Sequence, residues 1–112
     1  MNKNEILKIV ITKLEQTPHT NLDSLKGAIK EELRRRGQYG EVTRQLGGNL
    51  SVTENLRMDN KTALLTNEVI YDLLYGRVIT PGMDEQNLDL PWIHVSSQEK
   101  LAEIKEKLNQ EV

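Results

Sequence analysis

The sequence predicts a single, mainly α-helical domain of 112 residues that carries a small β-hairpin followed by a C-terminal helix. Three observations support this class. Leu, Ile and Val recur at helical spacing in four segments, and Gly or Pro stands at most of their ends. Two short β-branched segments, 78–80 and 92–95, lie between the last two helical segments. A chain of this length is large enough to bury one hydrophobic core.

The first two helices are expected at about 4–16 and 22–36. In the first, Ile6, Val10 and Leu14 recur on one face, and Pro18 prevents the helix from continuing. The second begins after Asn21, whose side chain can accept hydrogen bonds from free backbone amides. Gly37 suits the left-handed conformation that ends many helices.

Residues 37–65 are rich in glycine and predict mostly loop. One helical turn fits residues 41–46. Ser51 and Glu54 have the spacing of a capping box, which predicts a short helix through Met58. Residues 59–61 are typical of a turn.

Thr66 is expected to cap a third helix that runs to about Tyr75. A strand at 78–80 and a return strand at 92–95 follow, with Pro81-Gly82 suited to the centre of a type II turn. The return strand begins at Trp92, the single tryptophan, which we expect to fill the space between hairpin and core.

Ser96 and Glu99 form another capping-box pattern, which predicts a C-terminal helix at about 98–110. Leu101, Ile104 and Leu108 share one face of this helix. That face can pack on its own domain, or it can pair with a second copy to form a homodimer.

One stretch carries a family resemblance. Leu73-Leu-Tyr-Gly-Arg-Val-Ile-Thr-Pro-Gly82, with Asn87 and Leu90-Pro-Trp-Ile-His-Val95, resembles the winged helix-turn-helix-like segment of uncharacterised bacterial proteins, often associated with mobile elements or defence systems. The resemblance is strongest over residues 63–97. It implies a winged helix-like fold, with a three-helix core, a wing and the C-terminal helix, and a role in binding DNA.

Basic residues in the middle of the chain are the candidates for binding double-stranded DNA, because contacts with phosphates need Lys and Arg. Residues 22–62 hold eight basic residues against six acidic ones. The nucleic-acid-binding candidates are Lys26, Lys30, Arg34, Arg35, Arg36, Arg44, Arg57 and Lys61. The alternative is a solvated helix face, with Glu31 and Glu32 as local partners.

Residues 66–95 have the opposite charge, with five acidic residues against the single Arg77. Acidic side chains oppose a phosphate-lined groove, whereas clustered aromatic residues are typical of protein interfaces. Tyr71, Tyr75 and Trp92 are therefore the candidates for binding a partner protein.

Composition argues against catalysis and cofactors. The chain has no cysteine, and its two histidines, His19 and His94, have no neighbouring ligand at metal-binding spacing. We therefore expect no metal, no cofactor and no catalytic residue. No segment approaches the roughly 20 apolar residues that span a bilayer, so we expect a cytoplasmic protein.

Two hypotheses of function remain open at this point. The first is a small, non-enzymatic winged-helix protein that binds DNA or acts as an accessory regulator. The second is a protein–protein interaction adaptor that uses the same fold.

Overall fold

The computed structural model describes residues 1–110, which form four helices and five strands in two antiparallel sheets. In chain order these are α1 (Lys3–Gln16), β1 (His19–Asn21), α2 (Leu22–Arg35), β2 (Gly40–Gly47), β3 (Leu50–Leu56), α3 (Asn60–Tyr75), β4 (Ile79–Pro81), β5 (Trp92–Val95) and α4 (Gln98–Gln110). This is an α+β fold. The predicted class, a mainly α, winged helix-like domain with one small hairpin, is therefore wrong.

The first two helices are confirmed, and side-chain caps fix where they begin. The Asn2 side chain accepts a hydrogen bond from the Glu5 backbone N–H at 2.8 Å, in a reciprocal capping box. Asn21 accepts from Ser24 N–H at 2.8 Å, as its position before the helix predicts.

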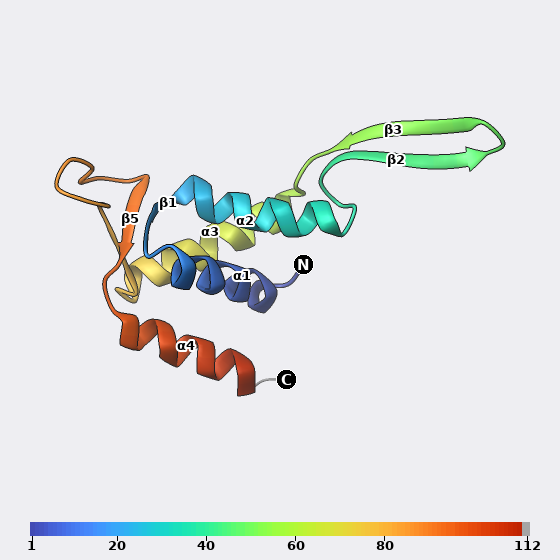
Figure 1. The fold of residues 1–112 in the computed structure, drawn as a ribbon. Coiled ribbons are helices and arrows are strands. Elements are labelled where there is room, and N and C mark those ends of the chain that lie inside the picture. The colour runs from blue at the N-terminus through green and yellow to red at the C-terminus, as the bar shows by residue number, and fades with distance from the viewer. Residues whose placement is uncertain (111–112) are drawn as a thin grey trace.

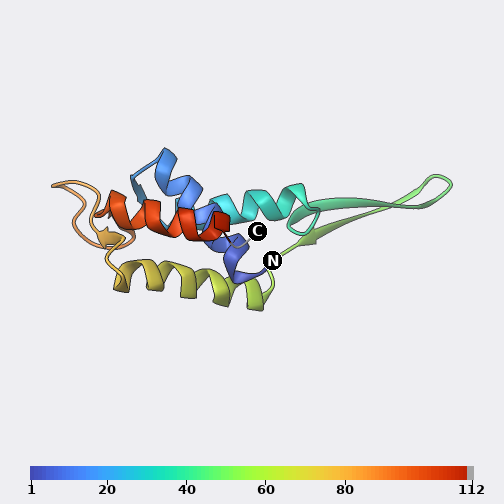
Figure 2. The same cartoon turned by 90° about the horizontal axis from the view of Figure 1, so that it is seen from below.

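The short helices predicted at 41–46 and 51–58 are wrong, because β2 and β3 pair there as a long hairpin. We call residues 40–56 the arm. Gly47 and Gly48 have positive φ angles of 104° and 60°, which allow the chain to reverse between the two strands. Thr43 pairs with Thr53 at the middle of the ladder. Figures 1 and 2 show the arm projecting from the helices.

Helix α3 begins six residues before its predicted cap, Thr66. The Asp59 carboxylate accepts a hydrogen bond from Thr62 N–H at 2.7 Å, so residues 59–61 start the helix and do not form a separate turn. Thr66 is buried inside the helix, where its hydroxyl donates to the Thr62 carbonyl oxygen at 2.8 Å.

The three-stranded sheet has the order β1-β5-β4. The predicted hairpin is confirmed, with Ile79 opposite Val95. The additional strand, β1, pairs His19 with His94 on the other edge of β5. The central strand β5 thus joins the segment between α1 and α2 to the end of α3 (Figure 1).

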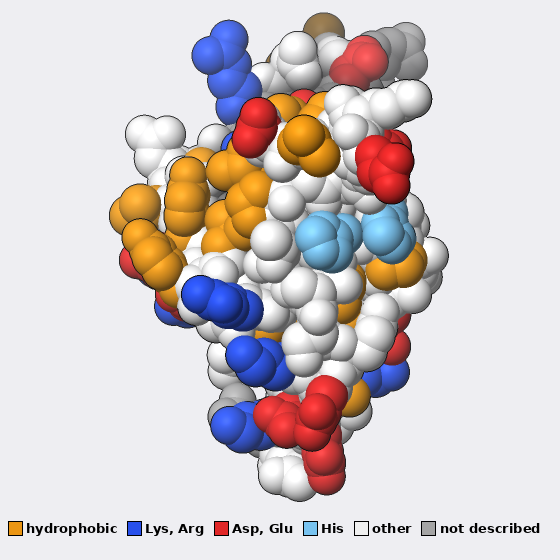
Figure 3. Space-filling model, turned by 90° about the vertical axis from the view of Figure 1, so that its left-hand side faces the viewer, with side chains coloured by type: hydrophobic (Ala, Val, Ile, Leu, Met, Phe, Trp, Pro, Cys, Tyr) orange, Lys and Arg blue, Asp and Glu red, His pale blue; other side chains and the backbone are white. Residues whose placement is uncertain are grey.

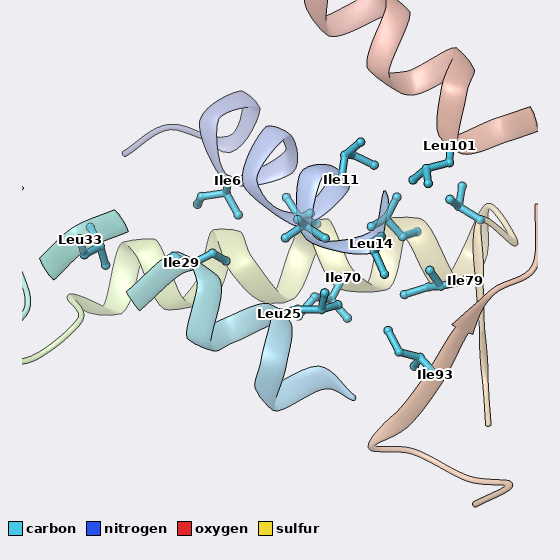
Figure 4. Close-up of a cluster of buried hydrophobic side chains, with 14 residues drawn as sticks. Ile6, Ile11, Leu14, Leu25, Ile29, Leu33, Ile70, Ile79, Ile93 and Leu101 are labelled. Carbon is cyan, nitrogen blue, oxygen red and sulfur yellow. The ribbon is translucent and has the colours of Figure 1, made fainter. Parts of the chain in front are cut away.

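The hydrophobic core lies between α1, α2, α3 and the three-stranded sheet, and α4 adds Leu101 to it (Figure 4). Its buried members are Ile6, Val10, Ile11, Leu14, Leu25, Ile29, Leu33, Val69, Ile70, Leu73, Val78, Ile79, Ile93 and Leu101. None of them comes from the arm.

Helix α4 packs on its own chain. Leu101 is buried, and Ile104 packs against the core. Lys105 Nζ lies 3.0 Å from Glu15 Oε2 of α1, which joins the two helices at the surface. Ser97, one residue after the predicted Ser96, provides the cap, with its hydroxyl 3.2 Å from Lys100 N. Among residues 1–110, no helix has the length and hydropathy needed to cross a membrane.

Candidate binding surfaces

The arginines at the end of α2, which the sequence offers as phosphate contacts, are ion-paired. Arg34 contacts Glu31, and Arg35 contacts Glu32, each one turn earlier on the same helix. Exposed pairs of this kind contribute little to stability. They do neutralise the positive charge that DNA would need.

Arg36 forms an ion pair that joins the end of α2 to the start of α1. Its Nη2 lies 2.9 Å from Glu5 Oε2, and its Nε lies 3.2 Å from Glu32 Oε1. The hydrogen bond from Arg36 holds the pKa of Glu5 below its ordinary value. This arginine therefore connects two helices, a contact that the sequence did not predict.

Lys30 and Arg34 flank an aromatic ring at the base of the arm. Lys30 Nζ and Arg34 Cζ each lie 5.8 Å from the centroid of the Tyr39 ring, within the range of cation–π attraction. Tyr39 is half-buried against the core. These contacts position the arm's first residues relative to α2.

A shallow groove of about 300 Å³ lies between α2 and α3. Lys26 and Lys30 line it from α2, and Ala63 and Asn67 line it from α3. Among the described residues 1–110, Lys26 has no ion-pair partner within 4 Å. This groove is the part of the predicted DNA surface that the fold brings together.

The remaining basic candidates are dispersed. Arg44 lies on the arm, with its Nη2 3.7 Å from Glu54 Oε2. Arg57 follows the arm, and Lys61 lies in the first turn of α3. Within residues 1–110, neither Arg57 nor Lys61 has an ion-pair partner. The eight residues thus come from α2 and its end, the arm, the segment after the arm and α3.

Helix α3 presents a stripe of large exposed side chains, Leu64, Tyr71 and Tyr75, which we call the α3 stripe. Their spacing of seven and four residues places them along one side of the helix. Tyr71 is 49% exposed and Tyr75 is 86% exposed. Both tyrosines predicted to bind a partner are therefore accessible.

The acidic residues of α3 lie beside the stripe and contact the start of α1. Lys3 Nζ lies 3.0 Å from Asp72 Oδ2 and 3.9 Å from Glu68 Oε2. The two carboxylates thus face the start of α1, where a cation offsets their charge. Glu68 shares the side of the helix that carries the α3 stripe, because it lies four residues after Leu64 and three before Tyr71, and its side chain is 48% exposed.

The segment between β4 and β5, residues 82–91, projects from the end of the molecule that carries the three-stranded sheet (Figures 1 and 2). We call it the acidic loop, because it holds Asp84, Glu85 and Asp89. Leu88 and Leu90 are exposed beside these carboxylates. Figure 3 shows hydrophobic side chains gathered on this end of the molecule, with acidic ones close by.

Trp92 does not fill the core as predicted. It is half-buried at the start of β5, whereas its neighbour Ile93 is fully buried. Because side chains alternate along a strand, the inward position belongs to Ile93. Trp92 therefore remains partly accessible, next to the acidic loop.

His19 and His94 form a pair that the sequence did not predict. Their rings stack with centroids 5.9 Å apart, and both are visible side by side in Figure 3. They line a pocket of about 330 Å³ with Asp84 and Leu88. Within residues 1–110, however, no group of three or more His, Cys, Asp or Glu side chains is placed to hold a metal ion.

The arm is the other feature that was not predicted. Its signal is the alternation of residues along Leu50–Leu56 and the Gly47-Gly48 pair, which together are typical of a hairpin. The capping-box spacing of Ser51 and Glu54 instead led to the incorrect prediction of a helix through Met58.

Comparison with known proteins gives no relative. No family model, no curated protein and no solved structure matches the chain. The interpretation of function therefore depends on these surfaces.

Proposed function

We propose that this protein is a non-enzymatic interaction module that binds a partner protein through the α3 stripe and the acidic loop. The observation that carries the proposal is the exposure of Tyr71 and Tyr75 on one side of α3. A tyrosine side chain buries a large area at low entropic cost. Tyrosine is also enriched among the few interface residues that contribute most of the binding energy.

The negative charge of the acidic loop indicates which kind of partner surface it can bind. Asp84, Glu85 and Asp89 lie in the same loop as the exposed Leu88 and Leu90. A partner with an apolar centre and a basic rim complements this surface, because opposite charges speed association and exclude wrong partners.

The proposal is tested by purifying the native protein from its own cells and identifying any stoichiometric companion. Replacing Tyr71 and Tyr75 by Ala should abolish the complex and leave thermal unfolding nearly unchanged, since both side chains are exposed. Leu46→Ala, at an exposed position on the arm, is the matched control and should retain the complex. A complex that survives the double tyrosine variant excludes this surface.

A second candidate function is DNA binding, which the groove between α2 and α3 favours. Lys26 and Lys30 stand on one side of the groove, and Asn67, a residue type suited to base contacts, stands on the other. The resemblance of residues 63–97 to winged helix-turn-helix-like segments is the sequence observation behind this candidate. The charge of residues 66–95 argues against it, because five acidic residues against one arginine repel phosphates.

Titration onto duplex DNA at several salt concentrations tests this second candidate. Replacing Lys26 and Lys30 by Gln should weaken binding, and it should reduce the salt slope by about one for each phosphate that is no longer neutralised. Replacing Lys8, an exposed lysine of α1, by Gln is the control and should leave binding unchanged. An absence of binding at low salt removes this candidate.

A further inference from the structure

The two faces of the arm differ in chemistry. Residues 41, 43 and 45 of β2 and 51, 53 and 55 of β3 share one face, because side chains alternate along a strand. All six are polar, and the Thr43 and Thr53 hydroxyls lie 3.1 Å apart across the strands. We call this the polar face.

The opposite face is apolar around one ion pair. Leu50, Val52 and Leu56 lie on it in β3, together with Arg44 and Glu54, whose side chains approach to 3.7 Å. We call it the apolar face. At the arm's tip, Leu46 is 63% exposed and Leu50 is 69% exposed.

Within residues 1–110, no element packs over the outer part of this face. The side chains of residues 43–53 are all exposed, and none of these residues belongs to the core. An isolated two-stranded ribbon is marginally stable in water and needs a further layer against its apolar side. The apolar face is therefore a surface that lacks its second layer.

We propose that the second layer is the apolar face of another copy of this chain. A two-fold dimer requires a surface that complements itself. The apolar face meets this requirement because it carries one cation and one anion, Arg44 and Glu54, between apolar side chains. When two copies pack in antiparallel orientation, each Arg44 approaches the partner's Glu54.

The geometry matches sheet-on-sheet packing, in which two ribbons lie about 10 Å apart with their apolar side chains between them. Strand β2 has eight residues, so the layer is about 27 Å long. Because each arm contributes only a few apolar side chains, the buried area should lie at the small end of specific interfaces. The dimer should therefore dissociate on dilution. This inference goes beyond the proposed function, because it uses neither the α3 stripe nor the acidic loop.

Charge reversal provides the decisive experiment. Arg44→Glu gives an arm with two acids at this site, and Glu54→Arg gives an arm with two bases. In sedimentation velocity of the full chain, the wild type should shift from monomer to dimer as concentration rises. Each variant alone should raise the dimer dissociation constant by roughly tenfold or more, because two equivalent ion contacts become repulsive.

Mixing the two variants should restore the dimer, as a heterodimer of one acidic and one basic arm. A purely intramolecular role of the Arg44–Glu54 pair cannot produce this rescue, because each chain still carries like charges. A mixture that stays monomeric, with both variants folded, overturns the proposal. A wild type that is monomeric at every concentration overturns it too.

A second pair of variants tests the apolar contact. Replacing Leu50 and Val52 by Thr retains a residue type that suits strands but removes apolar area, and it should weaken the dimer. Ser51→Thr, on the polar face, is the matched control and should leave the dimer unchanged. If the wild type binds DNA or another protein through Leu50 and Val52 without self-association, the occupant is not a second copy and the proposal is wrong.

Discussion

His19 and His94 stand opposite each other on β1 and β5, with ring planes inclined by 18°. Each ring is anchored to one of two consecutive carbonyl groups at the start of the acidic loop. His19 Nδ1 lies 2.9 Å from the Met83 oxygen, and His94 Nδ1 lies 2.7 Å from the Gly82 oxygen. The histidines therefore connect the sheet to the loop.

The first prediction concerns the tautomer of these rings. A carbonyl oxygen can only accept, so each neutral ring carries its proton on Nδ1 and leaves Nε2 free. Long-range ¹H–¹⁵N spectra of the neutral rings should show the Nδ1–H form for both residues. Nε2–H signals for both rings would contradict the anchoring.

Anchoring also predicts the effect of removing one ring. His94→Ala should increase amide hydrogen exchange in residues 82–88, because the loop loses the bond to the Gly82 carbonyl. Exchange in the arm, which lies at the opposite end of the molecule (Figure 1), is the internal control and should stay unchanged. An unaltered loop would show that the ring does not restrain it.

The histidine pair illustrates what the sequence could and could not predict. Local signals were sufficient for α1 and α2, since Asn21 caps the second helix from the adjacent position. They were also sufficient for the β4–β5 hairpin, whose strands are close in sequence. The pairing of His19 with His94 depends on β1 docking against β5, which no local pattern records.

The prediction for the arm was wrong for a different reason. Ser51 and Glu54 match a capping box, but a capping box stabilises a helix only when an apolar stripe follows that can be buried. Here the alternating strand pattern and the Gly47-Gly48 turn decided the outcome. Among the candidate site residues, Tyr71 and Tyr75 are accessible, as a role in binding requires. The arginines are paired, because Glu31 and Glu32 lie three or four residues before them.

The second prediction concerns the core. Ile93→Ala should lower the free energy of unfolding by about 2–5 kcal/mol, because Ile93 is fully buried on the central strand. Leu64→Ala removes a similar side chain from the exposed α3 stripe and should change stability by no more than about 0.5 kcal/mol. Thermal unfolding of both variants measures the difference. Equal losses would contradict the placement of β5 at the centre of the fold.

The third prediction concerns the stability of the acidic loop at low pH. The backbone N–H of Gln86 donates to the Asp84 carboxylate at 2.9 Å, and this bond holds the pKa of Asp84 below its ordinary value. Because the pKa is lowered, the ionised Asp84 carboxylate stabilises the loop fully at pH values above the ordinary aspartate pKa of about 4. This stabilisation is lost as the pH falls through the lower, folded-state value.

The amide signals of Gln86 and Asn87 should therefore titrate with a midpoint below that of a free aspartate. Asp84→Asn removes the titrating group but retains an acceptor oxygen, so these signals should become independent of pH in the acid range. A midpoint at or above the ordinary value would exclude the hydrogen bonds from Gln86 and Asn87 as the organising contacts of the loop.

The fourth prediction compares two glycines that differ in conformation. Gly27 lies inside α2, and a Cβ atom built there meets nothing within 4 Å. Gly27→Ala should raise the free energy of unfolding by about 0.5–1 kcal/mol, because alanine has the higher helix propensity.

Gly82 instead has a φ angle of 104°, and its Cβ would lie 3.0 Å from the Leu88 carbonyl oxygen. Gly82→Ala should therefore destabilise the protein by more than Gly27→Ala stabilises it, since alanine is strained at this φ and crowds the backbone of the loop. Denaturant unfolding of the two variants gives both signs in one experiment. A neutral Gly82→Ala would mean that residues 82–88 do not adopt the closed turn that holds the Gly82 carbonyl against His94.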